Sequence, residues 1–597
     1  MLEPRSPRDG AFARALSSNA FLLATLALAA ALRAAHILAL RHLPIFDGLI
    51  LDSWMYDAWA QRIAAGDLLG GPRPFYQDPL YPYFLAAFYR VVGRDLLLVR
   101  MLHLALGVGT CGLVALIGRR IGGPLAGNVG ALLFAVYRPE IFQGGELEKT
   151  ALSVFLLTAA LWLALQETVR ARLASGVALG LAALTRGNLL LVVPLGALWF
   201  LAEPTPEPQE GPGAGWWPRV LGRLSGRPGR SAAAFLAGTL LAIAPVTWRN
   251  HHVSGEWVLT VSGAGQVFYT GNNPANATGG FEHVPFVRSD PQFEETDFLA
   301  VAQARAGRPL SAREASAFWF REALDHVADH PGFAIQVALR KVGLILTDYE
   351  VPDAWDMYFL GRFSPALRFP MIGMGVLLPL AALGAAVTIR SRREVRLLVG
   401  FVGIYALSLV AFFVFSRYRL QVVPALSVLG GLAAPWAVQV WRARDVRSAV
   451  GSALGLAAVA AVSYAAGPDP GLRHSEHVHS FISLSLLYQQ RGEFASAEGL
   501  LAQASELHPG SAEPYFARGV LRLRTGRPAE ALADLRRCLS IDPDYPDAWL
   551  VLGMAFDGLG DPRAAAQAYR AQLARVPGHA DAMLRLRAAE SRGNGGR

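Results

Sequence analysis

The chain has 597 residues, of which 53% are hydrophobic and only 17% are charged, against roughly 25% charged residues in an average soluble domain. This balance excludes a disordered chain and an ordinary soluble enzyme. The net charge of +9 comes almost wholly from arginine, because Lys149 and Lys341 are the two lysines. That usage fits a GC-rich bacterial gene better than a nucleic-acid-binding surface, so no nucleic-acid partner is expected. Cys111 lies in an apolar block and Cys538 in a polar repeat, so no disulfide framework or cysteine zinc site is expected.

Apolar blocks of about 20 residues, the length that a helix needs to cross a bilayer, recur from the N-terminus onward. They lie near 19–40, 96–118, 123–137, 147–167, 173–185, 187–202, 232–248, 366–389, 395–414, 418–440 and 448–466. The first block has no small-residue cleavage site after it, so it is predicted to be retained as a membrane helix. Together the blocks predict an all-α, polytopic membrane helix bundle of about 11 spans over residues 1–466.

Arginine clusters in the short connections predict the orientation, because positively charged loops stay on the cytoplasmic side. With the N-terminus in the cytoplasm, all the clusters fall inside; they begin at Arg119, Arg170, Arg219, Arg390 and Arg442. Each span takes the chain to the other side of the membrane, and this alternation, or parity, places the long loops 41–95 and 249–365 on the extracytoplasmic side. It also places everything after about 467 there. A bacterial inner (plasma) membrane protein is therefore predicted, with its functional site in the long external loops.

A period of 34 residues begins near residue 478, after a predicted linker at 467–477. Three sets of residues recur with this 34-residue spacing: Gly492, Gly526 and Gly560; Ala497, Ala531 and Ala565; and Pro509, Pro543 and Pro577. The period predicts three tetratricopeptide repeats over 478–579, with a capping helix at 580–592, in an α-solenoid domain over 478–597. A protein or peptide partner on the concave face is expected; the alternative is a scaffold that helps the chain assemble.

Ionisable residues near the external ends of the spans are the candidate site, because charges at a bilayer are costly to keep. Asp52 follows the first span, Asp78 precedes the next helix, and Arg33 lies in the second half of the first span. Asp52 is expected to act as a general base or, with Asp78, to hold a divalent cation; the alternative is an ordinary helix cap. The next external turn adds Arg138, Glu146, Glu148 and Lys149.

The order of these features resembles the bacterial glycosyltransferase family 39 proteins, which share the GT-C fold with protein O-mannosyltransferases and lipid A aminoarabinose transferases. The resemblance starts with the arginine in the first span, the aspartate at its exit, YDAWAQRIAAGD and the DPLYP helix start. It continues with LAALTRGNLLLVVPL (181–195), WRNHHVSGEWVLT (248–260), GQVFYTGNNPANATGG (265–280) and SRYRLQVVPAL (416–426).

The resemblance implies a transferase that moves a sugar from a polyprenyl-phosphate donor to an acceptor on the extracytoplasmic face, among membrane lipids. Asp52 falls on the family's catalytic-aspartate position and Asp78 on its second acidic position. The chain reads Asp-Ser where the family commonly has Asp-Glu, and Asp-Pro in place of His-Pro or Pro-Pro. The acceptor and any requirement for a divalent cation therefore stay open.

Arginine suits the phosphate of such a donor, because its planar fork binds two phosphate oxygens at once. Arg186, Arg417, Tyr418 and Arg419 are expected at the donor phosphate; the alternatives are snorkelling for Arg417 and Arg419 and a structural tie for Arg186. A second set is expected either to shape a sugar pocket or to form ordinary turns: Tyr269, Asn272 and Asn273. A third is expected to be a solvated face, with substrate contact as the alternative: Asp348, Glu350 and Asp353.

Two other classes of protein stay open. One is an O-antigen polymerase or ligase-type enzyme, which would depend on His283 and Arg288 in the late external loop rather than on Asp52. The other is a non-enzymatic membrane anchor that presents the repeats to a partner.

Overall fold

The computed structural model describes residues 7–204, 224–288, 291–368, 371–467 and 470–594. The chain forms two compact units: Met1–Arg41 with Leu49–Pro468, and His42–Gly48 with Asp469–Arg597. Regular structure in the described residues is helical, apart from one isolated bridge between Tyr137 and Ile372. The all-α prediction is confirmed, whereas the predicted cytoplasmic Arg219 lies outside the described residues.

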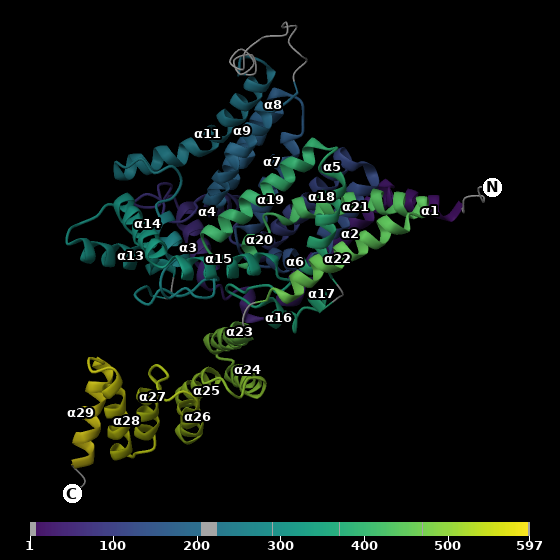
Figure 1. The fold of residues 1–597 in the computed structure, drawn as a ribbon. Helices are drawn as coiled ribbons and strands as arrows, with labels where there is room; N and C mark the ends of the chain where they lie inside the picture. Colours follow the sequence, from purple (N-terminus) through teal and green to yellow (C-terminus); the bar gives the residue numbers. More distant parts are fainter. Residues whose placement is uncertain (1–6, 205–223, 289–290, 369–370, 468–469, 595–597) are drawn as a thin grey trace. The chain divides into compact units, whose positions relative to one another are not determined.

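Six helices of the first unit are long and apolar enough to cross a membrane (Figure 1). They are α2 (Asn19–Leu40), α5 (Leu96–Ala135), α11 (Arg227–Ser254), α19 (Arg393–Ala411), α21 (Val423–Ala443) and α22 (Val446–Ala465). The other predicted blocks correspond to shorter helices: α7 (Thr150–Ala164), α8 (Val169–Thr185), η2 (Gly187–Val192) with α9 (Val193–Leu201), and α18 (Met374–Thr388). The chain is a multi-pass membrane protein, but the predicted number of eleven spans is not confirmed.

One of the six, α5, consists of two arms that were predicted as separate blocks. Gly123 interrupts it with φ +82°, a value that glycine adopts without strain, and Pro124 starts the second arm. A Cβ atom on Gly118 would lie 2.7 Å from the Cα of Gly127, so the arms pack through glycines. Such small residues allow close helix packing in membranes.

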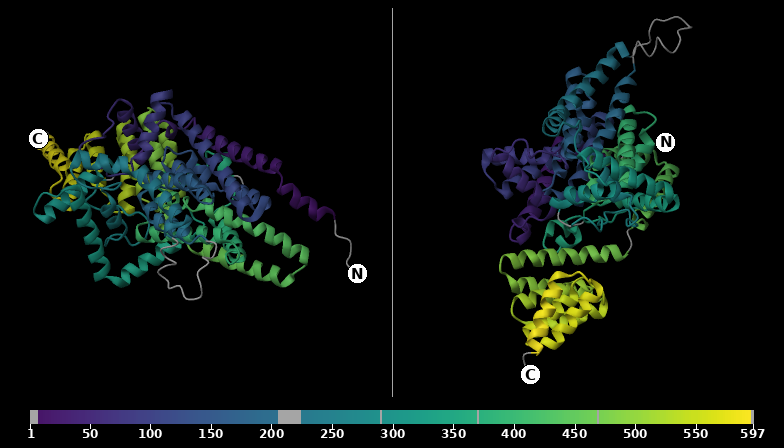
Figure 2. Two further views of the ribbon diagram at one scale, coloured as in Figure 1. Left: turned by 90° about the horizontal axis from the view of Figure 1, so that it is seen from above. Right: turned by 90° about the vertical axis from the view of Figure 1, so that its left-hand side faces the viewer.

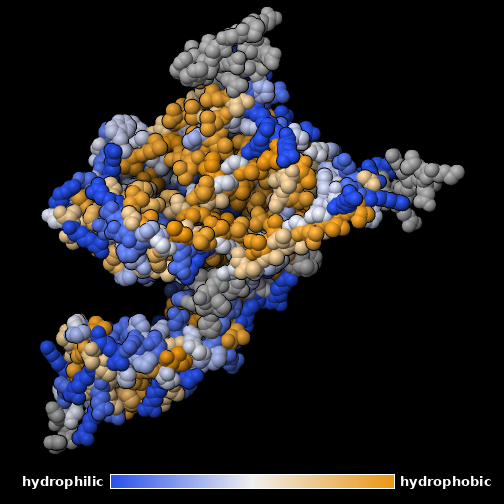
Figure 3. Space-filling model, viewed as in Figure 1, coloured by the Kyte–Doolittle hydropathy of each residue, from blue (hydrophilic) through white to orange (hydrophobic). Residues whose placement is uncertain are grey.

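The centre of the first unit is the N-terminal half of α21, where the residues from Val423 to Ala433 are buried. This half packs against α5 and α18. The outer helices keep their apolar side chains exposed, and Figure 3 shows a broad hydrophobic surface over α9, α11 and α19. Exposed apolar helix faces of this kind fit contact with lipid.

The predicted external segments fold into shorter helices. Those before residue 150 are α3 (Leu51–Ala64), α4 (Leu80–Val92) and α6 (Arg138–Gly144). Those between α11 and α18 are α12 (Ala264–Gly271), α13 (Pro291–Ala306), α14 (Ala312–Asp329), α15 (Pro331–Leu346), α16 (Met357–Leu360) and α17 (Pro365–Arg368). The short helix α20 (Ser416–Arg419) lies between α19 and α21. Outside the predicted external segments, α1 (Pro7–Leu16) precedes α2. An aromatic core around Trp319 joins α12, α13 and α14.

The second unit is the predicted helical repeat. Its helices are η1 (Pro44–Phe46), α23 (Pro470–Gln490), α24 (Phe494–Leu507), α25 (Glu513–Arg524), α26 (Pro528–Ile541), α27 (Ala548–Gly558), α28 (Pro562–Arg575) and α29 (Ala580–Asn594). Figure 2 shows the last of them packing as neighbouring helices, and each consecutive pair from α23 to α29 is in contact. Gly492, Gly526 and Gly560 have φ of 78°, 74° and 74°, so each repeat turns at its left-handed glycine.

Two boundaries differ from the prediction. Residues 42–48, expected in the first external loop, belong to the second unit, where Asp47 and Arg491 form an ion pair of 3.3 Å. Helix α23 starts at Pro470, inside the segment expected to be a linker. The segment contains Pro470, and a proline is tolerated in the first turn of a helix, so α23 can begin there.

Candidate active site

The candidate site is a cluster of charges in which Arg417 contacts three carboxylates from separate segments. Its Nη2 donates to Oδ2 of Asp52 over 2.9 Å. Its Nη1 lies 2.8 Å from Oε2 of Glu148, and its Nε lies 2.7 Å from Oδ2 of Asp353. Arg417 precedes α21, Asp52 is in the first turn of α3, Glu148 lies between α6 and α7, and Asp353 precedes α16.

Burial makes the cluster electrostatically strong, since the side chain of Arg417 is only 6% exposed. Burial alone would lower the pKa of Arg417, but the carboxylates of Asp353, Glu148 and Asp52 raise it well above its ordinary value. Burial raises the pKa of Glu148 and of Asp353, and Arg417 opposes both shifts. Arg417 is therefore a permanent cation that holds the three acids together.

The start of α3 presents Asp52 in an unusual backbone setting. Leu51 has φ +49°, in the left-handed region that leucine rarely adopts. One turn after Asp52, Tyr56 is completely buried, and its hydroxyl has no hydrogen-bond partner among the described residues. The side chains of Asp52 and Asp353 are 20% and 22% exposed, whereas that of Glu148 is 5% exposed, so two carboxylates of the cluster reach the surface.

A second ion pair lies beside the first. Nζ of Lys149 donates to Oδ2 of Asp78 over 2.5 Å, and the backbone N–H of Gly187 donates to Oδ1 over 3.1 Å. The same ammonium group lies 5.7 Å from the ring centre of Tyr56. Since Lys149 directly follows Glu148, the two ion pairs are connected through the chain and through Tyr56.

Arg186, near these ion pairs, has hydrogen-bond donors that no acceptor among the described residues uses. Its guanidinium lies over the ring of Tyr418 at 4.3 Å, and its side chain is buried. In the described part of the chain, its Nε and Nη2 have no hydrogen-bond partner. A buried guanidinium with open donors is suited to an anionic ligand such as a phosphate.

At the predicted divalent-cation site, each aspartate contacts a cationic side chain of the protein. Asp52 and Asp78, its expected ligands, contact Arg417 and Lys149 respectively. Among the described residues, no group of three or more His, Cys, Asp and Glu side chains is arranged to hold a metal ion. The positive charge next to each aspartate therefore comes from a side chain of the protein.

Of the other predicted residues, Arg33 and Arg138 lie away from the cluster, whereas Glu146 is close enough to Asp353 for the two charges to interact. Arg33 is buried within α2, where its Nη1 donates to the carbonyl of Ala29 over 3.2 Å. Arg138 lines a separate cavity of about 540 Å³, together with Tyr358, Arg362 and Arg368 among others. Glu146 is partly buried, and burial raises the pKa of its carboxyl to about 7, with Arg100 opposing the shift.

The residues expected to shape a sugar pocket stabilise local structure instead. Tyr269 packs against Trp319, with ring centres 4.6 Å apart. Nδ2 of Asn272 donates to the carbonyls of Phe268 and Ala411, and Nδ2 of Asn273 donates to those of Tyr269 and Thr270. These contacts are those of the alternative interpretation, in which asparagines close turns.

Arg419 and Glu350 form a structural contact rather than part of the cluster. Nη2 of Arg419 lies 2.5 Å from Oε2 of Glu350, and the guanidinium also donates to the carbonyls of Leu344, Thr347 and Tyr349. The side chain of Glu350 is 4% exposed. The expectation that Glu350 and Asp353 belong to a solvated face is therefore wrong, because each is paired with a buried arginine.

The sequence analysis missed Tyr56 as a member of the site, and it gave substrate contact by Asp353 only as the alternative to a solvated face. Asp353 lies in a long loop whose fold no short-range pattern predicts. Tyr56 stands four residues after Asp52, the helical spacing that places both on one face of α3, and that signal was available.

Family comparisons agree with the architecture. Residues 73–208 match the family described as dolichyl-phosphate-mannose-protein mannosyltransferase, and residues 522–590 match the tetratricopeptide repeat. The matched range contains Asp78, Glu148, Lys149 and Arg186, whereas Asp52 and Arg417 lie outside it. The matches confirm the predicted resemblance and the repeats, and the class of enzyme that they identify is a glycosyltransferase. No curated protein matches the sequence of this chain.

Among solved structures, ArnT from Cupriavidus metallidurans bound to undecaprenyl phosphate aligns with 93% of this chain and 80% of its own, at 14% identity and a TM-score of 0.40. The oligosaccharyltransferase of Archaeoglobus fulgidus aligns with 76% and 57%, at 14% identity and a TM-score of 0.38. MamA aligns with 20% of this chain, at 25% identity and a TM-score of 0.19. The aligned part of this chain covers 64% of the length of MamA. At TM-scores this low, no residue receives a role from these structures.

Proposed function

We propose that this protein transfers a sugar from a polyprenyl-phosphate carrier to an acceptor on the extracytoplasmic face of the membrane, with Asp52 as the general base. The observation that carries the proposal is the convergence of Asp52, Glu148 and Asp353 on Arg417. Since these residues come from different connections between apolar helices, their meeting supports a site at one end of the bundle.

The proposed orientation is supported by contacts on both faces. Parity places Asp52, Glu148, Arg186, Asp353 and Arg417 outside, and they gather at or near one cluster. Parity places Arg120, Glu167 and Arg227 inside, and Glu167 lies 3.7 Å from Arg120 and 4.0 Å from Arg227. A maleimide-reactive cysteine introduced into 478–579 should therefore be labelled from outside intact spheroplasts; labelling only after lysis would contradict this orientation.

The chemistry needs a base for the acceptor and cations for the departing phosphate. The acceptor oxygen or nitrogen attacks the anomeric carbon, its proton passes to Asp52, and the bond from that carbon to the phosphate oxygen breaks. Within the described residues, Oδ1 of Asp52 accepts no hydrogen bond and is open to that proton, while Oδ2 accepts from Arg417. The phosphate leaves as an anion, which the open donors of Arg186 can bind.

The proposal is tested by mass spectrometry of glycans and glycoproteins in a deletion strain that carries wild-type or variant protein. Asp52→Asn should abolish the sugar addition that wild type restores, while Asp67→Asn, an exposed position of the same external segment, should not. His283→Ala and Arg288→Ala test the polymerase or ligase alternative, and Arg288 is a surface residue paired with Asp297 at 2.6 Å. Restoration by Asp52→Asn, or loss only with His283→Ala or Arg288→Ala, would contradict the proposal.

A further inference from the structure

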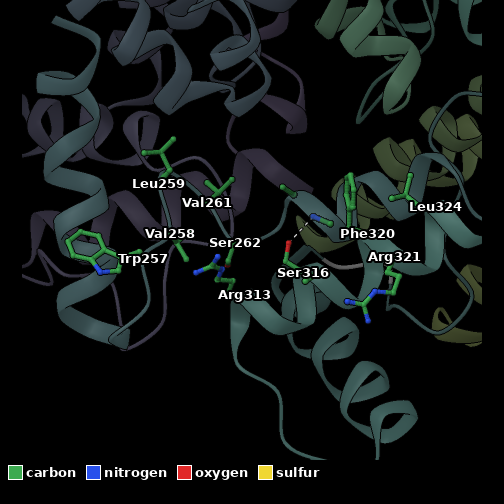
Figure 4. Close-up of a pocket in the computed structure, with 13 residues that line it drawn as sticks. Trp257, Val258, Leu259, Val261, Ser262, Arg313, Ser316, Phe320, Arg321 and Leu324 are labelled. Atoms are coloured by element: carbon green, nitrogen blue, oxygen red, sulfur yellow. Dashed lines mark hydrogen bonds between the residues drawn. The ribbon is translucent and has the colours of Figure 1, made fainter. Parts of the chain in front are cut away.

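A cavity of about 580 Å³ lies between α14 and the segment that follows α11. Six of its lining residues come from one face of α14, at helical spacing: Arg313, Ser316, Ala317, Phe320, Arg321 and Leu324. The opposite wall includes Trp257, Leu259 and Val261 (Figure 4). We call this cavity the α14 groove.

The α14 groove is apolar along its middle. The opposite face of the helix is in the aromatic core, where Ala315, Trp319 and Ala323 are buried. On the groove side, Phe320 and Leu324 remain exposed. A helix that exposes Phe320 and Leu324 on its outer face while its inner face is already buried indicates a second apolar environment outside the protein.

That environment is continuous with the membrane-facing side of α11. This candidate span exposes Leu240, Leu241 and Trp248, and the chain then exposes Trp257, which is 64% exposed, and Leu259. Exposed apolar side chains therefore occur both on a membrane helix and on the segment that leads from it into the groove. Tryptophan is enriched where membrane helices reach the headgroup region, because its ring is apolar and its N–H is polar.

The charges of the groove select the chemistry of the ligand. Arg313 and Arg321 lie eight residues apart on the lining face, so their Cα atoms are separated by about 12 Å along the helix axis. Both side chains are exposed, and no ion pair of either is found among the described residues. Two such guanidinium groups beside an apolar surface match the phosphate and acyl chains of an anionic lipid.

One carboxylate lies at the rim, and its oxygens are already used. Glu256 accepts a hydrogen bond from the hydroxyl of Ser311, the N-cap of α14, and from the backbone N–H of Arg313 over 3.4 Å. It therefore stabilises the start of α14 rather than a guanidinium group of the groove.

We propose that the α14 groove binds an anionic phospholipid of the outer leaflet, with Arg313 and Arg321 at the phosphate and Phe320, Leu324 and Leu259 along an acyl chain. The groove adjoins the candidate site: a Cβ atom on Gly187, whose N–H binds Asp78, would lie 3.9 Å from Cγ2 of Val261. A bound lipid would therefore line the wall behind Asp78, whatever reaction the site performs.

The test uses the full chain in nanodiscs of equal phosphatidylglycerol and phosphatidylcholine, followed by native mass spectrometry of the lipids that stay bound. Wild type should retain phosphatidylglycerol preferentially, and R313Q/R321Q should reduce that preference by about ten-fold or more. The matched control, R41Q/R62Q, removes two exposed arginines outside the groove and should keep the preference. Equal retention by R313Q/R321Q, or no preference in wild type, overturns the proposal.

A second measurement detects contact of the acyl chain with the groove rather than retention of the lipid. Cys111 and Cys538 are buried, so a fluorophore can be placed on Phe320→Cys alone. Phosphatidylglycerol with a spin label on its acyl chain should quench this fluorophore, and quenching should be lost when R313Q/R321Q is added. An unquenched fluorophore places the groove away from lipid and overturns the proposal. Displacement of the quencher by an equal amount of polyprenyl phosphate would instead make the groove a carrier site and would also overturn it.

Discussion

Asp52, in the first turn of α3, accepts a hydrogen bond of 2.9 Å from Arg417, which lies 365 residues further along the chain. Arg417 also contacts Glu148 and Asp353, so one cation fixes the relative positions of three segments. The first prediction concerns this shared cation.

Replacing Arg417 with glutamine should destabilise the folded protein by about 3 kcal/mol, because buried carboxylates would lose their counter-charge. Thermal unfolding in detergent measures the effect. Adding Asp353→Asn to Arg417→Gln should recover part of the loss, since one uncompensated charge is removed. A double variant that is less stable than Arg417→Gln alone would contradict this role.

The pair of Lys149 and Asp78 should act as one unit in the reaction. Lys149→Met and Asp78→Asn should each lower kcat/KM for the sugar donor, by about ten-fold, because each leaves its partner without its ion pair. The double variant should be no slower than the slower single variant. Losses that multiply in the double variant would show that the two residues act independently.

Stability should fall as the pH rises through neutrality, in part because of Glu146. Burial raises the pKa of this carboxyl from near 4.5 to about 7 in the folded state. A raised pKa means that the folded state holds the proton more tightly, so the stabilisation is complete below about pH 4.5 and is lost as the pH passes 7.

Glu146→Gln should therefore flatten the decline in unfolding temperature between about pH 5 and pH 8. Glu314→Gln is the matched control, because the hydrogen bond from Arg308 lowers the pKa of Glu314. A decline that is unchanged in Glu146→Gln would exclude this carboxyl as its source.

The repeat glycines allow a paired comparison in the second unit. Gly526 has φ +74°, so Gly526→Ala should cost about 1 kcal/mol of stability through backbone strain. Gly499 lies inside α24 with open space around it, so Gly499→Ala should stabilise the same unit by about 0.5 kcal/mol. Hydrogen exchange of the repeat helices in the full chain measures both, and equal signs for the two variants would contradict the assignment.

Much of the helical architecture was predictable because it depends on local patterns. The apolar blocks correspond to helices, and the 34-residue period gave the repeat through glycines that turn out to be left-handed. The 3.6-residue periodicity and the length of a bilayer-spanning helix both act over short stretches of chain. The separate apolar blocks 96–118 and 123–137 correspond to the two arms of α5 on either side of Gly123.

The pairing of charges was only partly predictable. Parity alone placed Asp52, Glu148 and Arg417 on one side of the membrane, and the structure brings them into contact. No local pattern distinguishes Asp353, which joins Arg417, from Glu350, which joins Arg419. That difference depends on how the loop between α11 and α18 folds, and the asparagines expected to line a pocket are used to build that loop.

If Asp52 takes the proton of the acceptor while a polyprenyl-phosphate donor is bound, its carboxylate must be needed for transfer by the purified protein. Sugar transfer from a radiolabelled polyprenyl-phosphate sugar is measured for the full chain as wild type, Asp52→Asn and Asp67→Asn, after thermal unfolding has shown that the three are equally stable. Wild type and Asp67→Asn should transfer the sugar, and the rate of Asp52→Asn should be lower by at least about 100-fold. Transfer by Asp52→Asn at the wild-type rate would show that Asp52 is not the general base.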